Sequence, residues 1–280
     1  MPAFTAPDGT ELAYHLRGEG EPLLVLPGGP MRASAYLGDL GGLSSRRRLI
    51  MLDPRGTGDS AVPADPATYR VDRQVADVEA FREHLGLDRV DVLAHSAGGD
   101  LALLHAARHP RHVRSLALIT ARARALGVDF TEEDRREAVA LRAGEPWFAT
   151  AYRAYEAVWA GEATDDDWDA IAPFFYGRWD GAARAHAATD VEQSNYGAAD
   201  RYAAPGAFDP AEALDALAGW DARVLVLAGE LDGGPLPRVA ATIAGLLPHA
   251  QPVVQPGAGH FPWLDDPRCF TGIVETFLQG

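Results

Sequence analysis

Lysine is absent from this sequence, and all 25 of its basic residues are arginine. Catalysis through a lysine Schiff base or a lysine general base is therefore excluded. Cysteine is almost absent as well: Cys269 stands alone and cannot form a disulfide within the chain, which is typical of a reducing compartment. Met1 to Asp8 lack the basic start and apolar stretch of a signal peptide, and no apolar run approaches the ~20 residues of a membrane span. We therefore expect a cytoplasmic protein with no membrane partner.

The sequence also lacks a surplus of positive charge. Its net charge is −15 at pH 7, and its densest basic cluster is only Arg46 to Arg48. Because nucleic-acid binding needs a concentrated basic surface, we expect no nucleic-acid partner. The negative field would favour cationic substrates, although solubility alone is the simpler explanation. With 280 residues, of which 47% are hydrophobic, the chain suits one α/β unit that carries an insertion.

Short apolar runs separated by helical patterns fill the first 120 residues. Continuous runs, each followed by turn residues, predict strands that are buried on both faces of a parallel sheet, over residues 23–26, 49–52, 90–94 and 116–119. Between them, apolar residues recur at helical spacing over residues 75–85 and 101–107. The alternating stretch Glu11–Arg17 predicts an antiparallel strand at the edge of the sheet.

The pattern changes at about residue 127. From there to about residue 218 the chain is acidic, aromatic and helical in pattern, and it shows no clear strand. Strand and helix patterns then resume, with strands predicted over residues 224–228 and 252–255 and helices over residues 236–247 and 270–278.

Alternation of strands and helices implies a parallel sheet with right-handed crossovers. We therefore predict an α/β fold with a mostly parallel sheet flanked by helices. Residues 1–126 and 219–280 would form this core domain, and residues 127–218 a helical cap domain inserted into it. Functional side chains in such sheets gather just beyond the carboxyl ends of the strands.

A serine stands where a buried strand is predicted to end and a helix to begin, in Ala94-His95-Ser96-Ala97-Gly98. A serine on such a sharp turn adopts a strained backbone, at a cost of roughly 1–3 kcal/mol, and presents its hydroxyl above the sheet. The residues two before and two after it must be small, as Ala94 and Gly98 are. Small residues also open helices without any such role, but the strand–turn–helix context favours Ser96 as a nucleophile.

An aspartate and a histidine follow later strands, in the chain order that this arrangement requires. Asp232 follows the strand predicted over residues 224–228, and His260 lies in the loop after the last predicted strand. Asp232 could instead be the N-cap of a helix that begins at Pro235. Glu230 is a rival acid. We favour Asp232 because the loop has more reach at that position.

The sequence has nine histidines, and His260 alone lies in a glycine-flanked loop after the final strand. Four others fall within or just beyond predicted helices, where cationic or solvated roles are expected: His84, His105, His109 and His112. His95 adjoins Ser96, but neighbouring side chains on a tight turn diverge. We therefore expect His260 to accept the serine proton.

Pro27-Gly28-Gly29-Pro30 follows the first of the buried runs. A glycine turn there can offer a bare amide to an anion, and we predict that the N–H groups of Gly29 and Ala97 form an oxyanion hole. Such a donor is typically worth ~10²–10³-fold in rate. A plain strand-ending turn would use the same residue types.

Asp53-Pro54-Arg55-Gly56-Thr57-Gly58-Asp59-Ser60 adds a third motif. Together with the motifs around Gly29 and Ser96, it resembles the α/β-hydrolase superfamily, and within it the proline iminopeptidase-like branch, whose Asp-x-Arg-Gly-x-Gly-x-Ser segment it matches in full. The resemblance covers nearly the whole chain outside the cap, and it implies that this segment is mainly structural and shapes the loop beneath the active site.

Two of the motifs depart from that branch. The loop at 27–30 is similar to the branch's His-Gly-Gly-Pro, with Pro27 in place of histidine and Met31 in place of the usual next glycine. The turn around Ser96 lacks the Gly-Gly-Ser-Trp-Gly of proline iminopeptidases and resembles a general esterase or hydrolase turn instead.

The motifs and the resemblance together imply a serine hydrolase that cleaves an amide or ester through an acyl-enzyme. The leading expectation is a proline iminopeptidase-like enzyme that removes an N-terminal residue from a short peptide or small amide. A carboxylesterase or lactonase acting on a small ester is the first alternative. A non-catalytic ligand-binding receptor on the same fold is an alternative of another class, although the complete set of three catalytic residues speaks against it.

An aminopeptidase of this kind needs carboxylates in or beneath the cap to hold the free amine of the substrate. Glu156 and Glu192 are candidates, although each would also suit a solvated helix face. Trp147 and Phe175 could line an apolar acyl or proline pocket, or form the core of the cap. The sequence shows no clustered metal-ligand spacing and no dinucleotide glycine fingerprint, so we expect no metal and no organic cofactor.

Overall fold

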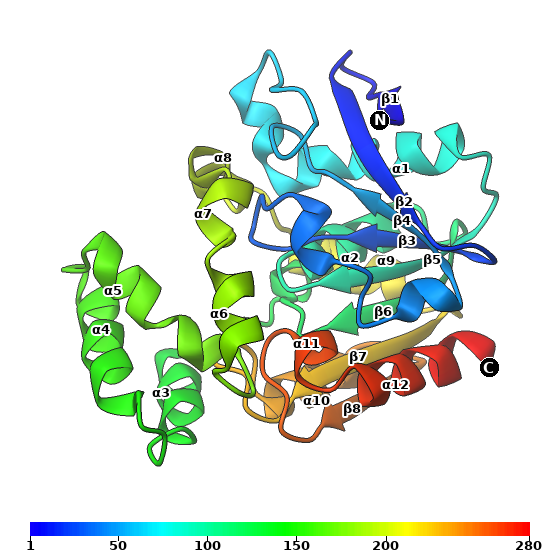
Figure 1. Cartoon of the computed structure of the whole chain (residues 1–280). Coiled ribbons are helices and arrows are strands. Elements are labelled where there is room, and N and C mark those ends of the chain that lie inside the picture. Colours follow the sequence, from blue (N-terminus) through cyan, green and yellow to red (C-terminus); the bar gives the residue numbers. More distant parts are fainter.

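The structure, a computed structural model, describes residues 1–280. Eight strands form one sheet in the order β1-β2-β4-β3-β5-β6-β7-β8 (Figure 1). Their bounds are β1 Ala3–Thr5, β2 Glu11–Arg17, β3 Pro22–Leu26, β4 Arg48–Leu52, β5 Val90–His95, β6 Val113–Ile119, β7 Arg223–Gly229 and β8 Ala250–Gln255. β2 is antiparallel to β1 and β4, and all other pairs are parallel. The predicted mostly parallel sheet is confirmed.

β2 is antiparallel, as predicted, but it does not lie at the edge of the sheet. The three-residue strand β1 pairs along its outer side, with Phe4 opposite Leu12. Leu12, Ala13 and Tyr14 of β2 are all buried, so both faces of this strand are covered there. β1 is too short to show a periodic pattern, which is why the sequence did not reveal it.

Helices cover both faces of the sheet (Figure 1). One face packs against α1 Val71–His84, α2 Gly98–Arg108, α9 Pro210–Leu217 and α10 Pro237–Gly245. The other face packs against α12 Pro267–Gln279, which follows the short α11 Pro262–Asp265. α10 begins at Pro237 and not at Pro235, because Leu236 is its N-cap and Pro237 takes the first helical position, where a missing N–H costs nothing.

Alternate residues of the central strands face two separate apolar layers. In β3, Leu24 and Leu26 belong to the layer beneath α1 and α2, whereas Leu23 and Val25 belong to the layer beneath α12. This burial on both faces explains why these strands read as continuous apolar runs in the sequence. Each fully buried leucine stabilises the fold by roughly 1.5–3 kcal/mol.

The chain between β6 and β7 leaves the sheet and is helical. It contains α3 Glu132–Ala140, α4 Phe148–Ala160, α5 Asp165–Ala170, α6 Gly181–Ala187, α7 Asp190–Gln193 and α8 Tyr196–Tyr202. The inserted helical segment is therefore present, as predicted. α9, which follows it, packs against α2 of the core. The predicted domain boundaries at residues 127 and 218 stay a prediction.

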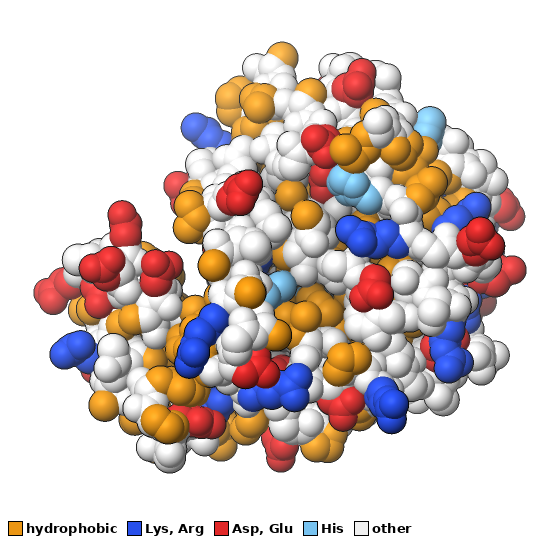
Figure 2. All heavy atoms as spheres, viewed as in Figure 1, with side chains coloured by type: hydrophobic (Ala, Val, Ile, Leu, Met, Phe, Trp, Pro, Cys, Tyr) orange, Lys and Arg blue, Asp and Glu red, His pale blue; other side chains and the backbone are white.

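α3, α4 and α5 form an outer lobe that stands away from the sheet, whereas α6 to α8 lie closer to it (Figure 1). The outer lobe has an apolar cluster of its own, separate from the two layers of the sheet. Acidic side chains gather on its surface (Figure 2), where α5 opens with Asp165, Asp166 and Asp167. None of the helices combines the length and the apolar character that crossing a membrane requires.

Candidate active site

Ser96 occupies the sharp turn between β5 and α2. Its φ is 52°, in the left-handed region that is costly for a residue with a side chain. The Ser96 N–H donates to the Ile119 carbonyl of β6 at 3.0 Å. The Ser96 carbonyl accepts from the N–H groups of Gly99 (3.0 Å) and Arg122 (2.9 Å). Backbone bonds to two elements therefore hold the strained turn that the sequence predicted.

Glycines let the loop at 27–30 pack directly against this turn. A Cβ on Gly98 would lie 2.5 Å from the Pro27 carbonyl oxygen. A Cβ on Gly28 would lie 2.7 Å from the Cβ of Ser96. Both distances are far below van der Waals contact, so a side chain at either position would push the two loops apart.

The imidazole of His260 is paired with a buried carboxylate. Its Nδ1 donates to Asp232, at 2.9 Å from Oδ2 and 3.1 Å from Oδ1. Asp232 is fully buried just beyond the end of β7, and its Oδ1 also accepts from the Gly234 N–H at 2.7 Å. Because the carboxylate holds the proton on Nδ1, Nε2 of His260 is left as the basic nitrogen.

The structure excludes an N-cap role for Asp232, and it excludes Glu230 as the partner of His260. Leu236 is the N-cap of α10, so Asp232 does not cap that helix. Glu230 is exposed, and its Oε2 accepts from the Gly257 N–H at 2.8 Å. His260 therefore pairs with Asp232 and not with Glu230.

The loops that carry Ser96 and His260 meet at the carboxyl edge of the sheet. His95, directly before Ser96, donates from Nε2 to the carbonyl of His260 at 2.9 Å. The rings of these two histidines lie 4.8 Å apart between centroids. Thr120, just after β6, donates its hydroxyl to the same carbonyl at 2.9 Å. The serine turn and the histidine loop therefore lie on the same side of the molecule.

The segment from Asp53 to Ser60 packs against the 3₁₀ helix η1 Ser34–Leu37 and against α1, and it holds the loop that follows β3. The buried Asp53 carboxylate accepts from the Ser34 N–H (2.8 Å) and hydroxyl (2.7 Å), in η1. Arg55 is also buried and forms a two-pronged ion pair with Asp77 of α1. These contacts fit the structural role that the family resemblance implied for the segment.

A buried tyrosine that the sequence pattern did not single out links these loops. Tyr36 of η1 accepts from the Gly28 N–H (2.7 Å), and its hydroxyl lies 2.7 Å from Nδ1 of His95. Burial raises the pKa of Tyr36 and lowers the pKa of His95 well below its usual value, so both groups stay neutral. Since Nε2 of His95 donates to a carbonyl, Tyr36 donates to Nδ1. His95 is thus held between Tyr36 and the loop of His260.

Two backbone N–H groups beside this turn have no acceptor in the protein. Those of Gly29 and Ala97 donate to no protein group, whereas the Gly28 N–H is taken by Tyr36. Gly29 has a φ of 117°, which only glycine adopts without strain. Ala97 precedes α2 directly, and the positive end of that helix favours a developing negative charge. Both N–H groups that the sequence predicted as oxyanion donors are therefore without a protein acceptor.

Arg32 ties the inserted segment to the loop after β3. Its side chain is nearly buried and pairs with Asp190 at 2.8 Å. The same guanidinium donates to Gln193 Oε1 at 3.0 Å. Both partners belong to α7, so this helix is fastened beside the loop that carries Gly29.

Two of the predicted cap residues are aromatic, and they lie in different places. The Phe175 carbonyl accepts from the His260 N–H at 2.8 Å, and the two rings are 5.9 Å apart between centroids. Trp147 packs edge-on against Phe174 at 5.2 Å, in the cluster of the outer lobe. The structure therefore brings Phe175 beside His260 and leaves Trp147 in the core of the outer lobe.

The two predicted carboxylates of the cap are both exposed. Glu156 lies on α4, 3.7 Å from Arg136 of α3, so its ionic contact is within the outer lobe. Glu192 lies on α7, between the two residues that bind Arg32. Of the two, Glu192 belongs to the helix that is fastened to the loop of Gly29.

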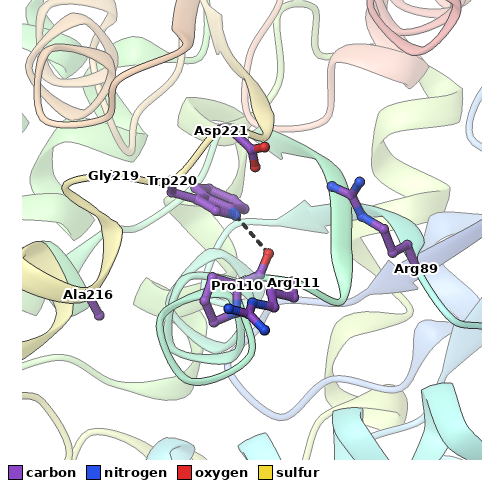
Figure 3. A pocket seen from close by; sticks show the side chains of 7 residues that line it. All are labelled: Arg89, Pro110, Arg111, Ala216, Gly219, Trp220 and Asp221. Atoms are coloured by element: carbon purple, nitrogen blue, oxygen red, sulfur yellow. Dashed lines mark hydrogen bonds between the residues drawn. The ribbon is translucent and has the colours of Figure 1, made fainter.

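A hollow of about 560 Å³ lies at the opposite edge of the sheet (Figure 3). Residues that precede strands line it: Arg89 before β5, Arg111 before β6 and Asp221 before β7. Trp220 also lines it and donates from Nε1 to the Pro110 carbonyl at 3.1 Å. Because functional groups of parallel sheets gather at the carboxyl ends of strands, this hollow is separate from the site around Ser96.

Known proteins resemble this chain in sequence and in structure. A family model described as alpha/beta hydrolase fold matches residues 21–267. A proline iminopeptidase from Lactobacillus helveticus is 38% identical over 117 residues, which cover 39% of this chain and 40% of that protein. The chain thus aligns with only about two fifths of the length of this curated relative.

Solved structures match over the whole chain. The proline iminopeptidase of Mycobacterium smegmatis is 27% identical, with a TM-score of 0.74 over 99% of this chain and 98% of that one. An esterase from Exiguobacterium antarcticum has a TM-score of 0.75 over 99% of both chains, at 20% identity. At that identity the esterase shows the shared fold alone.

Proposed function

This chain belongs to the α/β-hydrolase fold family, and from that premise we propose that it is a serine hydrolase with Ser96 as nucleophile, His260 as general base and Asp232 as the acid that orients the base. The observation that carries the proposal is the contact between His260 Nδ1 and the buried Asp232 carboxylate, at 2.9 Å. It lies at the carboxyl edge of the sheet, where the turn of Ser96 follows β5. An imidazole held in this way keeps Nε2 ready to accept a hydroxyl proton.

The proposed reaction is acyl transfer to water. Nε2 of His260 takes the hydroxyl proton while Oγ of Ser96 bonds to the carbonyl carbon of the substrate. The imidazolium then gives that proton to the leaving amine or alcohol as its bond to the carbonyl carbon breaks. His260 next deprotonates a water that attacks the acyl-enzyme, and Ser96 leaves with its proton restored. The Asp232 carboxylate stabilises the imidazolium in both halves of the reaction.

The negative charge that develops on the carbonyl oxygen needs donors that are already in place. The N–H groups of Gly29 and Ala97 would supply them, since neither has another acceptor. Tyr36 would contribute indirectly, because its bond to the Gly28 N–H fixes the loop that presents Gly29. Donors of this kind typically contribute ~10²–10³-fold to the rate each.

The proposed substrate is a short peptide or small amide with a free N-terminal residue. The 38% identity to one proline iminopeptidase and the 27% identity over nearly the whole of another support this class. A free amine is a cation at neutral pH and needs a carboxylate partner. Glu192 would be that partner, because α7 is fastened beside the loop of Gly29, whereas Glu156 lies in the outer lobe.

Hydrolysis of a small ester or lactone is the second proposal. The turn around the nucleophile favours it, because Ala97 takes the place where proline iminopeptidases have tryptophan and Ala94 the place of a glycine. Chemically, an ester and an amide make the same demands on Ser96, His260 and the two amides. The leaving group and the groups that recognise the acyl part would decide between them.

The two substrate classes can be separated by assaying proline naphthylamide beside a short nitrophenyl ester, with Ser96→Ala as control. We expect the wild-type protein to release naphthylamine and the variant to release neither product. Cleavage of the ester alone would contradict the peptidase proposal and leave the serine hydrolase standing. A fluorophosphonate probe should label the wild-type protein and not the variant. Absence of labelling in the wild type would favour the receptor alternative.

A further inference from the structure

Three histidines and a glutamate converge far from Ser96, where α1 packs against the last turns of α2. Glu79 lies on α1 and faces His105 of α2 and His109, the residue directly after α2. Its Oε2 is 3.0 Å from Nε2 of His105 and 4.0 Å from Nδ1 of His109. Its Oε1 is 2.8 Å from Nδ1 of His112, in the loop before β6. One ligand atom each from Glu79, His109 and His112 lie within 4.8 Å of one another.

Two of the three histidines, His109 and His112, form no hydrogen bond with the Glu79 carboxylate. His112 Nδ1 lies close to the Glu79 carboxylate but is not aligned with it, so this buried nitrogen has no hydrogen-bond partner. The ring of His112 stacks on that of His109, with centroids 5.7 Å apart and planes at 13°. The imidazoles of His109 and His112 therefore lie beside the carboxylate without hydrogen bonds to it.

Against the expectation of no metal from the sequence, we propose that Glu79, His109 and His112 form a binding site for a divalent transition-metal ion, and for zinc in particular. Imidazole nitrogen and carboxylate oxygen are ligands that zinc takes, usually in tetrahedral geometry. At zinc–ligand distances of about 2.0–2.2 Å, neighbouring ligands in a tetrahedron are roughly 3.3 Å apart. The ligand atoms lie within 4.8 Å of one another, which is wider than this spacing. The side chains of His109 and His112 are about one third exposed, so they have room to move to it. The fourth position would be filled by water.

Two further residues hold the carboxylate of this site. His105 is almost completely buried and donates to Oε2 of Glu79. Arg82 binds mainly the other oxygen, with Nη2 at 2.6 Å from Oε1. Carboxylates that bind metals are commonly hydrogen-bonded in this way, which fixes their orientation. The positive charge of Arg82, whose Nε also lies 3.3 Å from Oε2, weakens the attraction of this carboxylate for a cation.

The site would join two helices and a loop that are separate in sequence. Glu79 comes from α1, His109 follows the last residue of α2, and His112 comes directly before β6. The site lies toward the carboxyl end of α2, whereas Ser96 precedes the amino end of that helix. Zinc would therefore clamp α1 to α2 and take no part in the hydrolysis. This proposal stands independently of the proposed function.

The test is a titration of the tag-free, chelator-treated protein with zinc alone, in competition with a chromophoric chelator. We expect the wild type to bind one equivalent of zinc and its Tm to rise by at least roughly 2–4 °C at saturation. His109→Gln and His112→Gln should each weaken binding by at least about 100-fold, since loss of a metal ligand costs no less than loss of an outer partner. His249→Gln, an exposed histidine outside the cluster, is the matched control and should bind as the wild type does.

Several outcomes of this titration would contradict the proposed zinc site. Absence of zinc binding in the wild type would do so directly. Unchanged zinc affinity in both cluster variants, or an equal loss in the His249→Gln control, would place any bound zinc elsewhere. Turnover on the best substrate should not depend on zinc, and its abolition on zinc removal would contradict the clamp role. Circular dichroism of the zinc-free variants shows whether they fold, so that a loss of affinity is not a loss of structure.

Discussion

Ser96 holds a backbone conformation that glycine would adopt more easily. Ser96→Gly and Ser96→Ala both remove the hydroxyl, and we expect either to lower kcat/KM by at least about 10⁴-fold. The glycine variant should be more stable than the alanine variant by about 1 kcal/mol, because a Cβ makes a φ of 52° costly. Urea unfolding and an activity assay measure the two effects. Equal stabilities of the glycine and alanine variants would mean that the turn is unstrained. Turnover that survives in either variant would mean that Ser96 is not the nucleophile.

Tyr36→Phe removes a hydroxyl that bonds two buried groups, the Gly28 N–H and His95. We expect the variant to lose roughly 1–3 kcal/mol of stability. Its kcat should fall while KM changes little, because Tyr36 bonds to the Gly28 N–H and to His95 and would act only by positioning the loops of the proposed site. Tyr14→Phe is the matched control, since that hydroxyl meets His84 (3.3 Å) away from the site. A Tyr36→Phe enzyme with the kcat of the Tyr14→Phe enzyme would contradict this role.

Asp100, in the first turn of α2, is buried, and burial raises its pKa to about 6 from an ordinary value of 3.8. The folded state therefore binds this proton more tightly than the unfolded state, and the wild type loses stability as pH rises from about 4 through about 6. Asp100→Asn has no such ionisation and can still accept from the Ala125 N–H. Relative to the wild type, the variant should gain on the order of 3 kcal/mol between pH 4 and pH 7. Urea unfolding at both pH values measures this, and a difference that does not vary with pH would contradict it.

Residues were predictable from the sequence where a local pattern carries the information. Ser96 is marked by the small residues around a strand-to-helix turn, and His260 by its glycine-flanked loop. The roles of Tyr36 and His95 were not predictable, because their bonds join positions far apart in the chain. The interpretation that His95 simply diverges from Ser96 overlooked that its ring nitrogens bond η1 and the loop of His260.

Elements were predictable where burial imposes one chemistry along a whole strand. β3 to β7 appear in the sequence as apolar runs because both of their faces pack against helices. β8 lies at the edge of the sheet, and the sequence pattern predicted only its residues 252–255. β1 was missed and β2 was placed at the edge, since three residues carry no period. α3 and α5 both open with a capping box, at Thr131 and Thr164, so their starts have a readable local signal.

A buried arginine is one of the contacts that attach the outer lobe, beside the ion pairs of Arg238 in α10 with Asp134 and Glu137 in α3. Arg142 follows α3 and donates to the carbonyls of Tyr176 (2.5 Å) and Gly177 (3.1 Å). Arg142→Met keeps the apolar stem and loses both bonds, so we expect faster hydrogen exchange across α3 to α5 with β3 to β7 unchanged. Arg136→Met is the control, because Arg136 is exposed and its ion pairs, with Glu132 and Glu156, both stay within the outer lobe. Equal exchange in the two variants would mean that Arg142 does not anchor the lobe.

At the scale of the whole molecule, the sequence defined composition and class but not relative placement. Acidic excess, absence of lysine and alternating strands and helices are readable without coordinates. How the inserted segment divides is not, because the outer lobe and α6 to α8 share the same helical, acidic and aromatic character. Only the tertiary contacts separate them: α7 is bound to Arg32 of the core loop, whereas α3 to α5 build a cluster of their own.

The net charge of −15 gives a final prediction that concerns the whole surface. A negative field concentrates cations and repels anions, and salt screens it, with a Debye length of about 30 Å at 0.01 M and about 3 Å at 1 M. For a substrate with a free amine, kcat/KM should therefore fall by roughly 2–10-fold between these salt concentrations. A neutral ester of similar size should show no such fall, which separates screening from effects of salt on the protein. Steady-state kinetics with both substrates measure this, and parallel salt responses would leave solubility as the role of the charge.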